Sequence, residues 1–131
     1  MPKTIIVAKV FVINSDSLIL ALRRSNTDTR RPLQWDLPGG EVEYGEDPAI
    51  GAIREAKEEA GIKIEGLRIN NVSSFKYPGV YGLHLTYYAY VQAPDIKLSY
   101  EHDQYKWVTK EEFTKLKIPQ YYKDSVEYLP K

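Results

Sequence analysis

The sequence predicts a single α/β domain in which a mixed β-sheet is covered by helices on its faces. Three observations lead to this prediction: the chain has 131 residues, Val- and Ile-rich segments alternate with helix-type segments, and one helix has a full set of boundary signals. A chain of this length buries one core but is too short for two ordinary domains. We therefore treat residues 1–131 as one domain with one site.

The N-terminal part is predicted to be mostly β-structure. Thr4–Ile13 is rich in Ile and Val, and a second apolar run, Leu18–Leu22, follows the turn-like Asn14–Asp16, so the two runs should form a β-hairpin. The polar, basic stretch Arg23–Arg31 should be a loop. A short strand at Gln34–Leu37 should end at the Pro-Gly-Gly that follows, because proline removes a ladder donor and glycine admits positive φ.

A helix is predicted over residues 47–60. Asp47 can cap it, Pro48 suits its first position, and Gly61 can take the left-handed conformation that ends it. Ala, Ile, Lys, Arg and Glu fill the body of this segment, and most of them are good helix formers. This helix should be the most regular element of the chain.

The second half adds three strands and two helices to the prediction. Ile62–Lys76 and Leu83–Gln92 are β-type runs on either side of a turn at Pro78-Gly79, and Tyr105–Val108 is another strand candidate. Thr109 can cap the next helix, with Glu112 at the capping-box position. A last amphipathic segment covers Tyr121 to Leu129, so the expected order is β, β, short β, α, β, β, β, α, α.

The composition excludes several classes of protein. Eighteen Lys and Arg residues balance eighteen Asp and Glu residues, so nothing in the overall charge favours a dedicated nucleic-acid or membrane-surface binder. The absence of cysteine excludes disulfides and thiolate chemistry. No apolar run reaches the roughly 18 residues needed to span a bilayer, and the N-terminus does not resemble a signal peptide. We expect a cytoplasmic protein.

The strongest chemical signal is the acidic face of the predicted helix. At about 100° per residue, Glu55, Glu58 and Glu59 share an arc of roughly 100°, while alanines and Ile53 fill the opposite side. Carboxylates three and four residues apart repel one another, and a divalent cation would turn this repulsion into coordination. Ligands that are all oxygens favour Mg²⁺ or Mn²⁺ over Zn²⁺. Taken alone, this stretch also fits an ordinary solvated helix face.

The surrounding residues add specificity to this signal. Residues 40–62 resemble the Nudix box of the Nudix hydrolases, G-x5-E-x7-R-E-U-x-E-E-x-G-U, where U is a bulky aliphatic residue. The matching charged and glycine positions are Gly40, Glu46, Arg54, Glu55, Glu58, Glu59 and Gly61. Ala56 departs from the motif, because a larger aliphatic residue is usual there. The preceding Trp-Asp-Leu-Pro-Gly-Gly also resembles the family's approach to the box.

The resemblance implies a Nudix α/β/α sandwich that hydrolyses a pyrophosphate bond in a nucleoside diphosphate derivative with Mg²⁺, or Mn²⁺ as a substitute. By analogy, Glu58 and Glu59 would be the principal metal ligands, joined by the carbonyl of Gly39. Glu55 would be a further ligand or the residue that orients or deprotonates water. Arg54 would hold the carboxylates in place, since a guanidinium grips a carboxylate in fixed geometry. Glu46 would help to fix the loop.

Two further groups of residues are candidates with less specific signals. Glu101, just before the strand that ends at Trp107, is a second candidate for the general base. An ordinary acidic residue in a surface loop explains it equally well. We expect no ligand role for His102. Arg23 and Arg24 could bind the distal phosphates or the sugar, with Arg30 and Arg31 as alternatives, and a solvated basic loop is the competing explanation. Eleven tyrosines offer surfaces on which a base could stack.

The motif indicates the reaction and says little about the substrate. The short chain resembles MutT-like members, which release a monophosphate and pyrophosphate from a modified or surplus nucleoside triphosphate. ADP-ribose or another nucleotide sugar is an alternative because of Pro78, and dinucleoside polyphosphates are another because of Tyr77 and Tyr81. A non-catalytic nucleotide-sensing protein is an alternative of another class. The expected partner is a small nucleotide, and a homodimer is compatible with this size.

Overall fold

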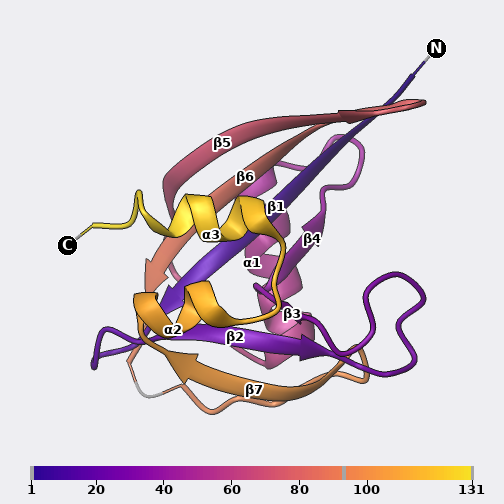
Figure 1. Cartoon of the computed structure of the whole chain (residues 1–131). Helices are drawn as coiled ribbons and strands as arrows, with labels where there is room; N and C mark the ends of the chain where they lie inside the picture. Colours follow the sequence, from indigo (N-terminus) through magenta and orange to yellow (C-terminus); the bar gives the residue numbers. More distant parts are fainter. Residues whose placement is uncertain (1, 93, 131) are drawn as a thin grey trace.

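The structure is a computed structural model that describes residues 2–92 and 94–130, and it contains a seven-stranded mixed sheet between helices (Figure 1). Helix α1 (Pro48–Ala60) covers one face, and α2 (Lys110–Lys115) and α3 (Gln120–Val126) cover the other. The strands are β1 (Lys3–Ile13), β2 (Ile19–Arg24), β3 (Trp35–Asp36), β4 (Gly39–Glu41), β5 (Arg68–Tyr77), β6 (Val80–Tyr90) and β7 (His102–Val108). The predicted α/β/α sandwich is confirmed.

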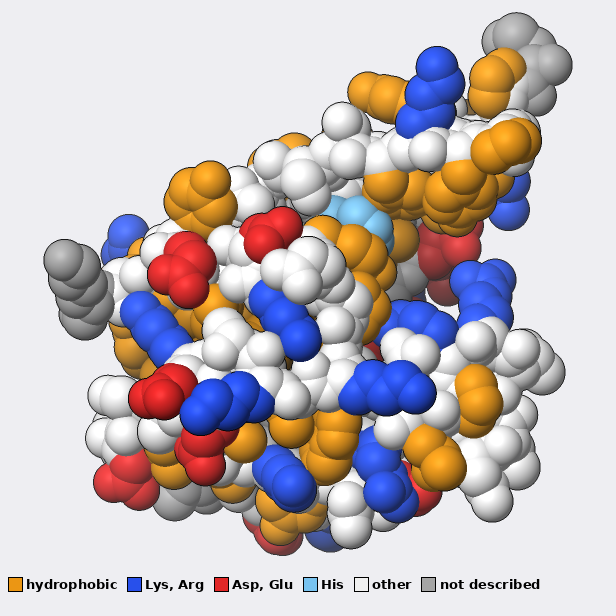
Figure 2. Space-filling model, in the orientation of Figure 1, with side chains coloured by type: hydrophobic (Ala, Val, Ile, Leu, Met, Phe, Trp, Pro, Cys, Tyr) orange, Lys and Arg blue, Asp and Glu red, His pale blue; other side chains and the backbone are white. Residues whose placement is uncertain are grey.

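Strand β1 is the centre of the sheet, and its main partner was not predicted. It pairs in parallel with β6 along its whole length, from Lys3 opposite Val80 to Ile13 opposite Tyr90. The expected hairpin with β2 is limited to one pair, Ile13 opposite Ile19, because β2 pairs along its length with β7 instead. The β5–β6 hairpin extends past the helices as an arm, which stands out in the space-filling view (Figure 2).

Several predicted boundaries differ from the structure. The run that begins at Ile62 becomes a strand only at Arg68, because Ile62 and Ile64 are buried against α1 as isolated core side chains. Gly39–Glu41 forms a strand that was not predicted, and it pairs with residues 7–9 of β1. Arg23 and Arg24 belong to β2 and not to the following loop.

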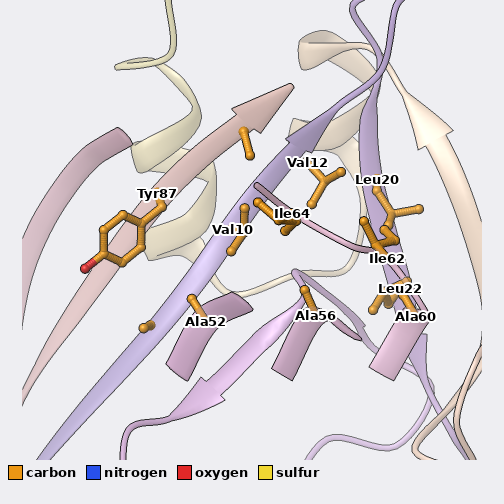
Figure 3. Close-up of a cluster of buried hydrophobic side chains, with 12 residues drawn as sticks. Val10, Val12, Leu20, Leu22, Ala52, Ala56, Ala60, Ile62, Ile64 and Tyr87 are labelled. Carbon is orange, nitrogen blue, oxygen red and sulfur yellow. The ribbon is translucent and has the colours of Figure 1, made fainter. Parts of the chain in front are cut away.

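The core has two halves, one on each face of the sheet. Val10 and Val12 of β1 pack on the α1 side, whereas Phe11 and Ile13 pack on the side of α2 and α3, as expected for alternating side chains in a strand. On the α1 side the helix contributes only small buried side chains, Ala52, Ala56 and Ala60 (Figure 3). Ala56, at the position where the chain departs from the motif, therefore lets α1 approach the sheet closely.

The predicted limits of α1 and the predicted start of α2 are confirmed by their caps, whereas α3 ends at Val126, before the predicted Leu129. The Asp47 carboxylate accepts from the backbone N–H groups of Ala49 and Ile50, and Gly61 ends α1 with a φ of 70°. Thr109 and Glu112 form both hydrogen bonds of a capping box at the start of α2. No helix within the described ranges is long and apolar enough to cross a bilayer.

Candidate active site

A cleft of about 660 Å³ opens between α1, the first half of β1, the β5–β6 arm, α3 and the loop after β2. In Figure 2, Lys and Arg side chains gather beside the hollow below the arm. Of the residues predicted for the site, Gly39, Arg24, Glu55, Glu59 and Glu101 line this cleft. The cleft thus brings together groups from four separate parts of the chain.

Glu55 and Glu59 line one side of the cleft. Together with Glu46, Arg54 and Glu58, which lie next to them outside the lining, they form what we call the acidic wall. Arg54 grips Glu46 in a bidentate pair, with Nε 2.8 Å from Oε2 and Nη2 3.0 Å from Oε1. Its Nη1 donates to Glu55 Oε1 at 3.0 Å and to Glu58 Oε2 at 3.4 Å. The hydrogen bond to Glu46 is the main cause that raises the pKa of Arg54. A single guanidinium therefore orients three carboxylates.

Glu59 is the most deeply buried carboxyl of the acidic wall, with 5% of its surface exposed. Its Oε1 accepts a hydrogen bond of 2.8 Å from the backbone N–H of Gly39. Burial raises the pKa of Glu59 to about 8 against the opposing charge of Lys9, and Glu55 and Asp36 add to the rise. Burial also raises the pKa of Glu55. Two carboxyls with raised pKa values in one cleft are typical of a functional site.

The three helix glutamates do not converge in this conformation. Glu58 has 57% of its side chain exposed, lies against Arg54 and is not part of the cleft lining. Across residues 2–92 and 94–130, no group of three acidic, histidine or cysteine side chains is arranged to hold an ion. The donors nevertheless fit a hard divalent cation in chemistry, because Glu55, Glu59 and the Gly39 backbone all present oxygens in one cleft. Glu58 would have to leave Arg54 to join them.

The opposite side, which we call the basic wall, consists of Lys9, Arg24 and Arg31 around the fully buried Asp36. Asp36 Oδ2 accepts from Arg24 Nη1 at 2.8 Å and from Arg31 Nη2 at 3.1 Å. Its Oδ1 lies 3.3 Å from Lys9 Nζ. Burial alone would raise the pKa of Asp36, but Lys9, Arg31 and Arg24 together hold it below the ordinary value. This carboxylate therefore stays charged in the core.

Gly39 joins the two walls. Its N–H donates to Glu59, and its carbonyl accepts from Lys9 Nζ at 2.9 Å. Gly39 has a φ of +129°, and a Cβ at this position would lie 2.1 Å from the carbonyl oxygen of Ala8. Only glycine fits where β4 approaches β1 this closely.

The structure separates the two neighbouring arginines that were predicted to bind substrate. Arg24 lines the cleft, as do the alternatives Arg30 and Arg31. Arg23 lies outside the lining and forms a bidentate pair with Asp103, at 2.8 and 3.0 Å. The pairing register between β2 and β7 shifts between Arg23 and Arg24, and the two side chains have different surroundings.

Glu101 lies in the turn before β7 and lines the cleft, so it is placed where a second general base could act. Its neighbour His102 is buried, and burial lowers the pKa of His102 to about 4. His102 is therefore neutral at pH 7.

The far end of the cleft is aromatic. His84 of β6 stacks on Tyr121 of α3 with ring centroids 3.9 Å apart, and it lies 4.5 Å from the Phe75 ring. Tyr77 and Tyr122 also line this end. A nucleobase could be accommodated against such flat, partly apolar surfaces.

Sequence reasoning missed Lys9, Asp36 and His84 as site residues. Each is a charged or titratable residue with an apolar neighbour on both sides in sequence, and that is the signal that could have identified them. Burial of a charge inside a strand requires a partner, so Lys9 and Asp36 could have been expected to meet.

Comparison with known proteins identifies the same family as the sequence motif. The family model described as NUDIX domain matches residues 3–130. The crystal structure of the MutT protein from Methanosarcina mazei Go1 superimposes with a TM-score of 0.86 and 33% identity, covering 96% of this chain and 92% of that one. The C. elegans Ap4A hydrolase binary complex gives a TM-score of 0.78 and 26% identity, covering 95% and 93%.

Matches to curated sequences are shorter. The chain is 43% identical over 54 residues to a MutT-like protein of Streptomyces ambofaciens, which covers 41% of this chain and 32% of that protein. It is 36% identical over 90 residues to the asymmetrical bis(5'-nucleosyl)-tetraphosphatase of Caenorhabditis elegans, covering 65% of each. The match thus spans between a third and two thirds of the length of these curated relatives.

Proposed function

Because the chain belongs to the NUDIX family, we propose that it is a metal-dependent pyrophosphohydrolase that converts a nucleoside triphosphate into a monophosphate and pyrophosphate. The observation that carries this proposal is the cleft itself. It brings the half-buried Glu55 and the buried Glu59 into one cleft with the cations of the basic wall, and the Gly39 peptide is hydrogen-bonded to both Glu59 and Lys9. An anhydride between two phosphates needs both a group that accepts a proton and positive charge for the phosphoryl oxygens.

In this proposal Glu58, Glu59 and the Gly39 carbonyl would hold Mg²⁺, for which Mn²⁺ could substitute, and Glu55 would be a further ligand if Glu101 is the base. When bound, the ion supplies positive charge to the phosphoryl oxygens and lowers the pKa of a coordinated water. Arg54 keeps Glu46 and Glu55 oriented through its hydrogen bonds, whereas Glu58 would exchange its contact with Arg54 for the ion.

The chain's own residues account for the proton and the leaving group. Glu55 or Glu101 accepts a proton from the attacking water, whose oxygen forms the new bond to phosphorus. The bridging P–O bond breaks, and its electron pair leaves on pyrophosphate, whose negative charge the basic wall receives. Both candidate bases line the cleft, so either can reach a water held inside it.

The substrate class rests on the similarity to MutT-like proteins across most of the chain. A dinucleoside polyphosphate is the second candidate, because the relative matched over 90 residues is a tetraphosphatase and Tyr77 lines the aromatic end of the cleft. Pro78 lies outside the cleft lining, which leaves the ADP-ribose alternative without structural support, and Tyr81, the other residue that suggested a dinucleoside polyphosphate, lies outside it too. All charged positions of the box are present, which favours catalysis over nucleotide sensing alone.

A substrate panel tests the proposal. Purified protein is incubated with nucleoside triphosphates, including oxidised purines, with diadenosine tetraphosphate and with ADP-ribose, each with Mg²⁺ or with EDTA, and phosphate and pyrophosphate release are followed separately. We expect pyrophosphate release from a triphosphate that stops in EDTA. Diadenosine tetraphosphate as the preferred substrate would move the assignment to the second candidate. No turnover of any compound with Mg²⁺ or Mn²⁺ would contradict catalysis.

A further inference from the structure

The basic wall contains more positive than negative charge, although one carboxylate organises it. Asp36 accepts four contacts: Oδ1 receives the backbone N–H of Leu37 at 2.8 Å and Lys9 Nζ at 3.3 Å, and Oδ2 receives Arg24 and Arg31. Three cations therefore surround one buried anion. The surplus positive charge lies on side chains that line the cleft.

A second aspartate fixes the loop that supplies Arg31. Asp28 pairs with Arg24 Nη2, and its Oδ1 accepts from the backbone N–H groups of Arg30 and Arg31 at 2.9 and 2.8 Å. The two ends of the loop are joined by backbone hydrogen bonds between Arg24 and residues 33 and 34. The guanidiniums of Arg24 and Arg31 are thus held in place by contacts from several segments of the chain.

Each of these guanidiniums keeps an unused donor. Arg24 Nε and Arg31 Nη1 are buried and have no hydrogen-bond partner among residues 2–92 and 94–130. Leaving a buried charged donor unpaired is costly, and a phosphate oxygen is an acceptor that matches the fork of an arginine. Because Lys9, Arg24 and Arg31 line the cleft, their surplus charge indicates an anionic ligand at this wall.

We propose that Asp36 is a positioning residue that presents Arg24 and Arg31 as a paired clamp for the pyrophosphate portion of the substrate. The clamp lies across the Gly39 peptide from the acidic wall, so it would hold the part of the substrate that leaves. This inference rests on the proposed function for the identity of the ligand, but the clamp itself can be tested without turnover.

The chain provides a matched control for this inference. Arg23 and Arg24 are consecutive residues of β2, and each is paired with an aspartate, Asp103 and Asp36 respectively. The Arg23–Asp103 pair is partly exposed and lies outside the cleft lining. The substitutions Asp36→Asn and Asp103→Asn therefore make the same chemical change on the two neighbouring arginines.

The test measures the binding of inorganic pyrophosphate by calorimetry in EDTA. We expect Asp36→Asn to weaken this binding by about 10-fold or more, the size of a lost hydrogen bond to a charged group, and Asp103→Asn to leave it within about 2-fold. With nucleotide and Mg²⁺, Asp36→Asn should raise KM by a similar factor and also lower kcat, because the clamp holds the pyrophosphate portion in the bound substrate and receives its charge as it leaves. A merely structural role would instead lower the active fraction, and with it kcat, at constant KM.

A second variant keeps the test decisive if Asp36→Asn does not fold. Arg31→Gln removes one guanidinium of the clamp from a partly exposed side chain and should also weaken pyrophosphate binding by about 10-fold. Unchanged binding in folded Asp36→Asn or in Arg31→Gln, or no binding of pyrophosphate by the wild type, overturns the inference. Pyrophosphate binding that depends on Asp36 in a protein without turnover would uphold the clamp while contradicting the proposed function.

Discussion

The two walls of the cleft have opposite arrangements of charge. In the acidic wall one cation, Arg54, contacts several carboxylates, with Glu46 the closest. In the basic wall one anion, Asp36, contacts three cations. In each wall the single residue of opposite charge fixes the geometry, and the surplus charge is left for a ligand. A cleft made in this way can accept a cation on one side and an anion on the other.

The walls also differ in how they are assembled along the chain. Residues 46–59 supply the acidic wall from α1 and the turn before it. The basic wall takes Lys9 from β1, Arg24 from β2, Arg31 from a loop and Asp36 from β3. Local spacing therefore defines the first wall, whereas only the sheet topology brings the second together.

The largest expected effect is in the acidic wall. Glu59→Gln and Glu58→Gln keep the size of the side chain but remove its charge, and we expect each to lower kcat by about 10²- to 10³-fold, as for loss of one preorganised electrostatic group. Turnover is measured at saturating Mg²⁺, with Glu111→Gln on exposed α2 as the control. Wild-type turnover by Glu58→Gln would show that its present contact with Arg54 is its whole role.

A smaller effect is expected from changing the residue that organises the acidic wall. Arg54→Lys keeps the charge but cannot make the bidentate pair with Glu46 while also contacting Glu55 and Glu58. We expect a loss of about 10- to 100-fold in kcat or in Mn²⁺ affinity, as for other residues that orient ligands. Arg68→Lys, at an exposed position of β5, is the matched control. Wild-type kcat and Mn²⁺ affinity in Arg54→Lys would mean that a positive charge at this position is sufficient and that the bidentate geometry of the guanidinium is not needed.

The smallest effect is expected from protonation of His84, which would add a positive charge beside the basic wall. Burial, helped by Lys9 and Arg31 and opposed by Asp36, lowers the pKa of His84 from 6.5 to about 4. The unfolded chain therefore binds a proton between pH 6.5 and 4 that the folded chain does not. The stabilisation is complete above pH 6.5 and is lost as the pH falls toward 4.

Urea unfolding at pH 7.5 and 4.5 measures this contribution. His84→Phe keeps a ring between Phe75 and Tyr121 but cannot titrate. We expect the wild type to lose about 1–2 kcal/mol more stability than the variant between these pH values, less than the full shift would give because the site is near the surface. Equal losses in both proteins would mean that His84 takes up its proton without cost in the folded state.

Most of the fold and half of the site could be predicted from the sequence. Asp47, Pro48 and Gly61 act locally, so the limits of α1 were correct to one residue. The parallel pairing of β1 with β6 joins residues far apart in the chain, and no local pattern encodes it. The same reason explains why Asp36 was missed, since its three partners come from other segments. Arg23 and Arg24 look alike in sequence, and only the register shift distinguishes them.

The parallel pairing of β1 with β6 also has a consequence for biosynthesis. Strand β1 is translated well before its main neighbour and cannot pair with it until residues 80–90 have emerged from the ribosome. Until then its apolar edge must be kept from other chains, and pairing across such a long stretch of chain is slow because the loop between the strands must first close. Lys9 and the β6 side of the cleft are therefore expected to come together only after β6 has been synthesised.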